Sequence, residues 1–399
     1  MADRAGEAAA DRAAGMTIPA DNRSGRAVPA KPKVILYSDS AEPSGVGEHM
    51  LQLARDMRQS VRVAFILNDT ANARHLARRA QAEGFDVECL PHDTRFEAAF
   101  ASALRLQAPD LLHIHAGIGW EGGRAPEAAR HAGVGVIVRT EHLPYLIGNE
   151  TERRAYFAAL PLLDAIICVS RSARDTYARA GVPGELLNVV RNGIAFRSAP
   201  ATREATRRAL GLAGDEAMVL TVARLTEQKG HRVLLVAIPH VLAQQPSARF
   251  FLAGAGPLET ALLHEIKARG LMANVTLLGE RADIPELLAA ADLFVLPSLF
   301  EGLPLSLLEA YAAALPVVAA RAPGTAEAAI DGQTALLVDP GDGEGLARAI
   351  MRLLCDPVLA QRIAANGARY VAEEFSAVRM ASETLRVYAS TPAFARSSR

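Results

Sequence analysis

The stretch LFEGLPLSLLEA contains two glutamates whose spacing could let both bind one ligand. Glu301 follows the apolar run LFVLPS, and Glu309 comes eight residues later, beyond a Gly-Leu-Pro elbow. Pro304 is a natural first-turn residue, which predicts a helix that carries Glu309 one to two turns from its start. Carboxylates accept hydrogen bonds from hydroxyl groups, so the pair could hold a ribose or a hexose. The spacing alone also allows Glu301 to be a helix-dipole partner and Glu309 a surface residue.

Two cations in an earlier loop suggest a second kind of chemistry. Arg224 and Lys229 lie in RLTEQKG, directly after the apolar run LTVA, in a chain that has only four lysines. Arginine offers a planar fork of donors and lysine a compact cation, and together they suit two phosphate groups. The alternative is a solvated loop with two ordinary surface cations.

Two glycines follow the next apolar run along the chain, FFLA. The segment GAGP contains Gly254 and Gly256, which could let backbone N–H groups approach a ligand at a helix N-terminus. Many helix starts look like this segment, so it does not by itself distinguish a binding loop from an ordinary turn.

The composition bounds the class of protein. At 399 residues the chain is long enough for two domains. Half of its residues are apolar, yet no run approaches the roughly 18–20 residues that cross a bilayer. Residues 1–30 lack the apolar core of a secretory signal and are expected to be a disordered leader. A net charge of −1 without a long basic block argues against nucleic acid as a ligand. Three widely separated cysteines, Cys89, Cys168 and Cys355, are typical of core residues in a cytosolic protein.

Short apolar runs alternate with segments of helical periodicity, which predicts parallel sheets covered on both faces. In the first half the expected strands are KVILYS (33–38), VRVAFIL (61–67), LLHIHA (111–116), VGVIVRT (134–140) and AIICVS (165–170). The rhythm pauses over 191–210 and resumes with AMVLTVARL (217–225), ARFFLAG (248–254), VTLLG (275–279), LFVLPS (293–298) and PVVAA (316–320). We therefore expect two Rossmann-like halves that offer the carboxyl-end loops of their strands to a shared crevice.

These motifs together carry a resemblance. VARLTEQKG, GAGP, VTLLG, ADLFVLPSLFEGLPLSLLEAYAAALPVVA and DGQTALLVDP occur in this order and resemble the donor half of family 4 retaining glycosyltransferases of the GT-B fold. The resemblance covers roughly residues 33–375 and is strongest over 217–340. It implies that Arg224 and Lys229 bind the diphosphate of a nucleotide sugar and stabilise the leaving group. It also implies that Glu301 lies near the donor hexose and that Glu309 holds the ribose hydroxyls.

The elbow and the glycine segment would line the same donor site. The residues expected to contact substrate in addition to Glu309 are Gly45, Gly254, Gly256, Gly302, Leu303 and Pro304. Gly45 is placed there because EPSGVGEHMLQLARDM resembles the family's glycine loop, with Ser44 in place of its first glycine.

Histidines in the first half resemble the family's reaction centre more loosely. VRTEHLPYL points to His142, which would position the sugar or the acceptor. LLHIHAG matches an H-x-H, and His113 and His115 would face the same side of a strand, a pattern that metal sites also use. No further ligand stands at a recognisable spacing, so the sequence predicts no metal and no cofactor.

The chain departs from the family pattern at two positions. Pro323 stands where the family usually has the first of two glycines, and Ala335 where glycine is common, while Gly324 and Glu327 match. These changes put the shape of one loop near the donor in question, not the fold.

The sequence bears on three rival classes of protein. A nicotinamide dehydrogenase would need G-x-G-x-x-G after the first strand, which is missing. A metal-dependent GT-A transferase would need Asp-x-Asp, and no two aspartates stand two apart. A non-catalytic nucleotide-sugar-binding protein of the same fold stays open, and donor hydrolysis would separate it from an enzyme.

The prediction for the whole chain is a hexosyltransferase of the GT-B fold. Its expected parts are a leader (1–30), an acceptor domain (31–195), a donor domain (196–375) and a C-terminal helix and tail (376–399). It would move a hexosyl group from a UDP- or GDP-linked sugar to a glycan, lipid-linked or small-molecule hydroxyl, with retention and without metal. We expect a cytoplasmic location, and peripheral contact with the inner face of the membrane stays open.

Overall fold

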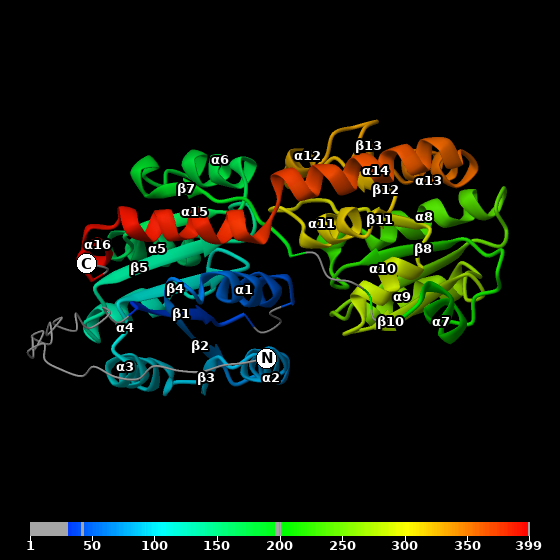
Figure 1. Ribbon diagram of the computed structural model, residues 1–399. Helices are drawn as coiled ribbons and strands as arrows, with labels where there is room; N and C mark the ends of the chain where they lie inside the picture. The colour runs from blue at the N-terminus through cyan, green and yellow to red at the C-terminus, as the bar shows by residue number, and fades with distance from the viewer. Residues whose placement is uncertain (1–30, 41–43, 92, 196–198, 200, 398–399) are drawn as a thin grey trace, which may run out of the picture. The chain divides into compact units, whose positions relative to one another are not determined.

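The computed structural model describes residues 31–40, 44–91, 93–195, 199 and 201–397. The expected leader therefore lies outside the described residues. Within them the strands form two parallel sheets, one in each half of the chain (Figure 1). This is the predicted α/β architecture of two Rossmann-like halves.

The first sheet has the order β3-β2-β1-β4-β5-β6-β7. Its strands are β1 (Lys33–Ser38), β2 (Arg62–Asn68), β3 (Asp86–Leu90), β4 (Leu111–Ala116), β5 (Val136–Glu141), β6 (Ala165–Cys168) and β7 (Leu187–Val189). Its helices are α1 (Ser44–Met57), α2 (Ala71–Ala82), α3 (Phe96–Gln107), α4 (Ala125–His131), α5 (Glu150–Ala159) and α6 (Arg171–Ala180). The strand order reverses between β1 and β4. Sheets of this kind bind ligands in the crevice at that point.

The second sheet has the order β10-β9-β8-β11-β12-β13. Its strands are β8 (Met218–Val222), β9 (Arg249–Ala253), β10 (Val275–Gly279), β11 (Leu293–Leu296), β12 (Val317–Ala320) and β13 (Leu336–Val338). The helices of this half are α7 (Arg203–Ala209), α8 (His231–Leu242), α9 (Glu259–Ala268), α10 (Ile284–Ala290), α11 (Leu305–Ala312), α12 (Pro323–Ala328), α13 (Gly343–Cys355) and α14 (Pro357–Glu374).

Each sheet is buried on both faces, which explains why its strands read as continuous apolar runs. On β1, Val34 and Leu36 pack into one hydrophobic cluster, while Ile35 and Tyr37 pack into another on the opposite face. The second sheet repeats this arrangement, because Val219 and Leu220 of β8 belong to different clusters. All strands expected from the sequence are present, and β3, β7 and β13 are additional.

The C-terminal segment returns to the first half of the chain. Helix α15 (Ala377–Ser390) packs on α1 and is followed by α16 (Pro392–Ser397), as Figure 1 shows in red. The hydroxyl of Tyr388 lies 2.6 Å from Nδ1 of His113 in β4. An isolated bridge between Ile194 and Ser376 pairs the two places at which the chain passes between the halves.

None of the helices in the described part of the chain combines the length and the apolar character that a membrane span requires.

Candidate functional site

A cavity of about 810 Å³ is lined by loops that follow strands of both sheets. Predicted site residues in its wall are Gly45, His142, Arg224, Lys229, Glu301, Leu303, Pro304 and Glu309. Gly254, Gly256 and Gly302 are neighbours of this wall rather than part of it. Segments about 260 residues apart in sequence thus meet in one cavity, from Gly45 to Glu309.

Lys229 and Glu301 form an ion pair in this cavity. The distance between Nζ of Lys229 and Oε1 of Glu301 is 2.6 Å, and only 3% of the glutamate side chain is exposed. Lys229 ends a short 3-10 helix, Glu227–Lys229, that follows β8, and Glu301 lies in the loop after β11. The two loops are joined further because Gln228 donates to the carbonyl of Phe300. The cation and the carboxylate assigned to different parts of a donor are therefore in direct contact.

Arg224 is held through its backbone by a histidine that the sequence analysis did not single out. His231, the first residue of α8, is buried, and its Nε2 lies 2.9 Å from the carbonyl oxygen of Arg224. Because the carbonyl is an acceptor, His231 Nε2 carries the proton. Burial lowers the pKa of His231, so the neutral ring is favoured. The guanidinium of Arg224 makes no hydrogen bond or ion pair with another described residue.

The GAGP segment packs against the Arg224 loop. Gly254 has φ +144, and a Cβ there would come within 2.0 Å of the carbonyl oxygen of Ala223. At Gly256 a Cβ would come within 2.6 Å of the carbonyl oxygen of Leu225. Leu225 N–H donates to the carbonyl of Ala255, so the two loops also share a hydrogen bond. The glycines thus allow the close approach of two backbones, and their contact with a ligand stays a prediction.

The elbow before α11 makes a similar close approach to the first half. A Cβ on Gly302 would come within 2.0 Å of the carbonyl oxygen of His142. Gly324 lies behind it, because a Cβ there would come within 2.1 Å of the Gly302 carbonyl oxygen. Pro304 is the N-cap residue of α11, one position before the first turn in which the sequence placed it. Glu309 lies in the second turn of this helix, as expected.

The departure at Pro323 is accommodated by the start of a helix. Pro323 is the first residue of α12, where its missing N–H costs nothing and its fixed φ suits the helix. Glu327, one turn later, accepts hydrogen bonds from the backbone N–H groups of Arg171 and Ser172 at 3.1 Å each. These are the first two residues of α6. The carboxylate thereby caps a helix of the first half and interacts favourably with its dipole.

His142 belongs to a group of imidazoles at the carboxyl ends of β4 and β5. Its Nε2 lies 3.2 Å from Nδ1 of His115, and its ring meets that of His49 at a centroid distance of 4.6 Å. Burial lowers the pKa of His49 to about 4 and lowers the pKa values of His115 and His142 well below 6.5. All three rings are therefore neutral at pH 7. The sequence placed His115 and His142 here but gave no sign of His49, which comes from α1.

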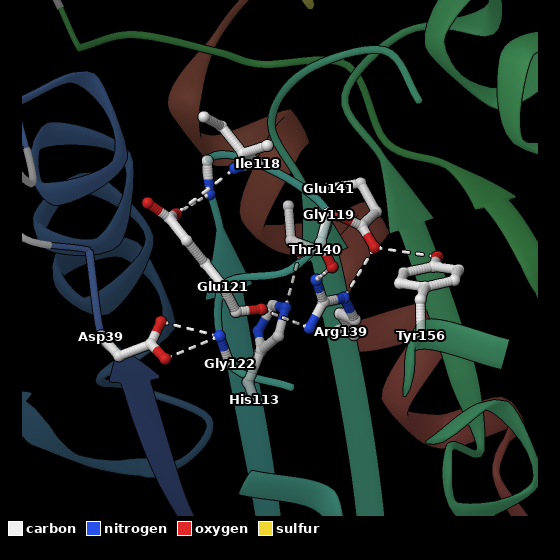
Figure 2. A network of polar contacts seen from close by, with 11 residues as sticks. Asp39, His113, Ile118, Gly119, Glu121, Gly122, Arg139, Thr140, Glu141 and Tyr156 are labelled. Carbon is white, nitrogen blue, oxygen red and sulfur yellow. Dashed lines mark hydrogen bonds and ion pairs between the residues drawn. The ribbon is translucent and has the colours of Figure 1, made fainter. Parts of the chain in front are cut away.

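A buried network fixes the loop after β4 (Figure 2). Arg139 donates to Oε1 of Glu141 at 2.6 Å and to the carbonyl oxygens of Gly119 and Glu121 at 2.7 Å. Tyr156 adds a hydrogen bond to the same Glu141 oxygen at 3.0 Å. Because Arg139 and Glu141 are both almost fully buried, the ion pair holds the loop backbone in one position.

The same loop presents a carboxylate to the cavity. Oε2 of Glu121 accepts from the backbone N–H groups of Gly117 at 2.6 Å and Ile118 at 3.3 Å (Figure 2). Asp39, at the end of β1, accepts from Gly122 N–H at 2.7 and 2.8 Å. Burial raises the pKa of Glu121. In the sequence, the only signal for Glu121 is its place in a loop after a predicted strand, and it was not predicted as a site residue.

Comparison with known proteins agrees with this geometry. The family model described as glycosyl transferases group 1 matches residues 202–370, and the model described as glycosyltransferase family 4 matches residues 43–196. The GDP-mannose-dependent alpha-(1-6)-phosphatidylinositol monomannoside mannosyltransferase of Mycolicibacterium smegmatis is 31% identical over 280 residues, which cover 62% of this chain and 69% of that one. The chain belongs to the group 1 glycosyltransferases.

Other relatives of this group 1 glycosyltransferase differ in their reactions. The alpha-maltose-1-phosphate synthase of M. smegmatis is 33% identical over 264 residues, and the match covers 61% of this chain and 66% of that one. The glycogen synthase of Mycobacterium tuberculosis is 30% identical over 269 residues, and the match covers 66% of this chain and 61% of that one. The match therefore spans slightly less than two thirds of the length of these two relatives.

Solved structures give the fold of this group 1 glycosyltransferase. HepE of Anabaena, crystallised with UDP and glucose, superposes with a TM-score of 0.78 at 23% identity, covering 90% of this chain and 100% of that one. Sucrose-phosphate synthase of Thermosynechococcus elongatus gives a TM-score of 0.73 at 22% identity, with 90% and 99% covered. The two Rossmann-like domains are those of the GT-B fold, as predicted.

Proposed function

We propose that the protein is a retaining hexosyltransferase that uses a nucleoside diphosphate sugar and transfers its sugar to a hydroxyl group. The observation that carries the proposal is the cavity that unites Arg224 and Lys229 with Glu301 and Glu309. Cations suit the diphosphate, and carboxylates suit the hydroxyls of the two sugars. Family membership and the names of relatives that use GDP-mannose or were crystallised with UDP support a donor of this class.

Charge separation is the central demand of this reaction. As the bond between the anomeric carbon and the phosphate oxygen breaks, negative charge grows on the diphosphate and positive charge on the sugar ring. Arg224 and Lys229 stabilise the diphosphate from fixed positions, which is preorganised electrostatic stabilisation. Glu301 holds the hexose hydroxyls, and Glu309 holds those of the ribose.

The acceptor hydroxyl attacks the anomeric carbon from the face that the phosphate leaves. A new glycosidic bond forms, the bond to phosphate breaks, and the hydroxyl proton passes to the departing phosphate oxygen. This balance needs no nucleophilic side chain and no metal ion, and His142 positions the sugar or the acceptor. The acceptor is a glycan, a lipid-linked sugar or a small molecule. Polar groups of the first half that line the cavity, such as Glu121, suit a hydroxyl-bearing acceptor of any of these classes.

A cytoplasmic location is part of the proposal. The three cysteines are free thiols, the state that the reducing cytoplasm maintains. Contact with the inner face of the membrane would follow if the acceptor is lipid-linked.

A donor screen tests the proposed function. UDP- and GDP-linked hexoses would be incubated with the purified full chain, and the released nucleoside diphosphate would be measured with and without simple sugar acceptors. We expect slow hydrolysis of one donor and faster release when an acceptor is present. The anomeric configuration of the product, read by proton NMR, should equal that of the donor. Tight donor binding without any release would instead support the non-catalytic binding protein, and an inverted product would overturn the retaining mechanism.

A further inference from the structure

A group of three imidazoles, two of which line the cavity, has the composition of a metal site. His49 of α1, His115 at the end of β4 and His142 directly after β5 each offer one ring nitrogen, and these nitrogens all lie within 4.8 Å of one another. They form the one group of three or more candidate ligands within the described part of the chain. The sequence analysis rejected a metal here because only the two histidines of β4 were adjacent, and the fold supplies the other ligands from distant segments.

The spacing of the nitrogens is close to what a tetrahedral ion requires. A zinc ion binds histidine nitrogen at about 2.0–2.1 Å, so two ligand nitrogens of a tetrahedral site lie about 3.4 Å apart. His115 Nδ1 and His142 Nε2 are already 3.2 Å apart. Since the ligand nitrogens all lie within 4.8 Å of one another, the widest separation needs to close by at most about 1.4 Å to complete the site.

Neighbouring groups orient one of these rings as they do in metal sites. Asn192 donates from Nδ2 to the carbonyl oxygen of Leu303 at 2.7 Å, which fixes its amide so that Oδ1 faces His49. Nδ1 of His49 lies 3.0 Å from Oδ1 of Asn192 and must therefore be the protonated nitrogen of the ring. Nε2 of His49 then has a free lone pair. An amide or carboxylate oxygen on the far nitrogen is the usual partner of a metal-binding histidine.

The other rings divide into one that is satisfied and one that is not. Both nitrogens of His113 have partners, Tyr388 and Thr140, each at 2.6 Å. His115, stacked on it at a centroid distance of 4.1 Å, has a buried Nε2 without a hydrogen-bond partner among the described residues. Because the nitrogen of His115 that faces His142 is Nδ1, Nδ1 is the candidate ligand atom, and Nε2 then carries the proton of the neutral ring.

We propose that His49, His115 and His142 bind a divalent transition metal such as Zn²⁺, whose fourth position opens into the cavity. Three neutral imidazoles without a carboxylate suit Zn²⁺, Co²⁺, Ni²⁺ or Cu²⁺, and do not suit Mg²⁺ or Mn²⁺, which prefer oxygen ligands. The metal inhibits the protein, because it engages the imidazole of His142 and obstructs the wall of the cavity. The inhibition rests on the proposed function, whereas the binding does not.

Cobalt absorption tests the site directly. The untagged, metal-free full chain would be titrated with Co²⁺ at pH 7.5, and Zn²⁺ would then be added. We expect the intense visible bands of four-coordinate Co²⁺ at a stoichiometry of one, and their loss when Zn²⁺ displaces it. The substitutions His49→Gln and His115→Gln should each weaken Co²⁺ binding by more than about tenfold, the effect of losing even an outer partner of a metal ligand. His264→Gln, on an exposed position of α9, is the matched control and should leave binding unchanged.

Two readouts keep this test decisive. If the His49 or His115 variant does not fold, X-ray absorption of the zinc-loaded wild type counts its imidazole ligands, and fewer than three would overturn the proposal. So would the weak spectrum of six-coordinate Co²⁺, or Co²⁺ binding that neither variant changes. Zn²⁺ should inhibit donor turnover at the concentration at which it displaces Co²⁺. If no donor is turned over, the proposed function fails, while the absorption titration still decides the metal site.

Discussion

At the scale of single residues, the ion pair between Lys229 and Glu301 has a consequence for donor binding. The 2.6 Å contact occupies the lysine that should bind phosphate and the carboxylate that should bind the hexose. A diphosphate would draw Lys229 away, and Glu301 would then be free to accept from sugar hydroxyls. Binding of the donor would therefore replace the Lys229–Glu301 ion pair with a lysine–phosphate contact and a glutamate–hydroxyl contact. Both buried charges would keep a partner before and after binding.

Arg224→Ala and Lys229→Ala separate catalytic loss from loss of stability. Each substitution should cost about 2–4 kcal/mol of transition-state stabilisation, because each removes a fixed donor to the leaving group. Lys229→Ala should also lower the free energy of unfolding by about 3 kcal/mol, since it leaves Glu301 buried without its cation. Steady-state kinetics and urea unfolding measure the two effects. Lys267→Ala, on an exposed position of α9, is the control, and near-normal turnover of both site variants would contradict the assignment.

Glu309→Gln and Glu301→Gln should differ in their effect on nucleoside diphosphate binding. A lost charge-assisted hydrogen bond is worth about 1.5–3 kcal/mol, so Glu309→Gln should weaken binding of the bare diphosphate by one to two decades. Glu301→Gln should not weaken it, because the substitution releases Lys229 for the phosphates, but it should lower turnover of the intact donor. Calorimetry and steady-state rates read the two effects. An equal loss of diphosphate affinity in both variants would mean that the division of roles is wrong.

His231 predicts a specific dependence of stability on pH. Its pKa in the folded state is lowered by burial, so the unfolded chain takes up a proton near pH 6.5 that the folded chain does not. The stabilisation from neutral His231 is therefore full above pH 6.5 and is lost as the pH falls toward the folded-state pKa. In His231→Gln the free energy of unfolding should fall less steeply below pH 6.5. Urea unfolding at several pH values checks this, with His240→Gln on the exposed face of α8 as the control.

At the scale of elements, the elbow before α11 brings the loops proposed to bind the donor against the backbone of His142. Gly302 packs on the backbone of His142, and Gly324 packs on Gly302, so α11, α12 and the loop after β5 meet without side chains between them. The position of His142 relative to Glu301 therefore depends on backbone contact. Such a contact leaves no room for adjustment.

Gly302→Ala should damage the site more than most surface changes. Its methyl group would lie 2.0 Å from the carbonyl oxygen of His142, so one of the two loops must move. We expect a loss of turnover of at least about tenfold, and a lower midpoint of thermal unfolding, since overpacking costs roughly 1–3 kcal/mol. Gly214→Ala, where a Cβ meets nothing within 4 Å, is the matched control. Unchanged kinetics in Gly302→Ala would show that the elbow is not held as the structure has it.

Local pattern sufficed for the central strands, because their apolar character depends on nearby residues. Runs such as KVILYS are apolar throughout since both faces are buried, and this is visible in sequence. Strand β3 was missed because it is an edge strand in which Asp86 and Glu88 interrupt the apolar run, and β13 because it has only three residues. His49 and His231 were missed for another reason. Their roles come from contacts with distant residues or with backbone, and no local period records those.

At the scale of the whole molecule, protein cations replace a metal in the proposed chemistry. Arg224 and Lys229 lie in the cavity, whereas the nearest group of metal-type ligands among the described residues is made of histidines and is unsuited to Mg²⁺. Donor turnover should therefore survive excess EDTA. If zinc occupies the histidines of a given preparation, EDTA should even raise the rate. Complete loss in chelator that Mg²⁺ or Mn²⁺ restores would overturn the metal-independent mechanism.

The return of α15 to the first half also bears on recombination between relatives. Tyr388 contacts His113, and Met380 accepts a hydrogen bond from the backbone N–H of Gly193, so α15 belongs with the first half although it follows the second half in sequence. A chimera with one junction near residue 194 would set a foreign α15 against the native β4 histidines. The neighbouring passages at Ile194 and Ser376 offer the natural cut points for a chimera with two junctions. The second half, and with it the proposed donor preference, can then be exchanged as an insert inside a first half that stays native.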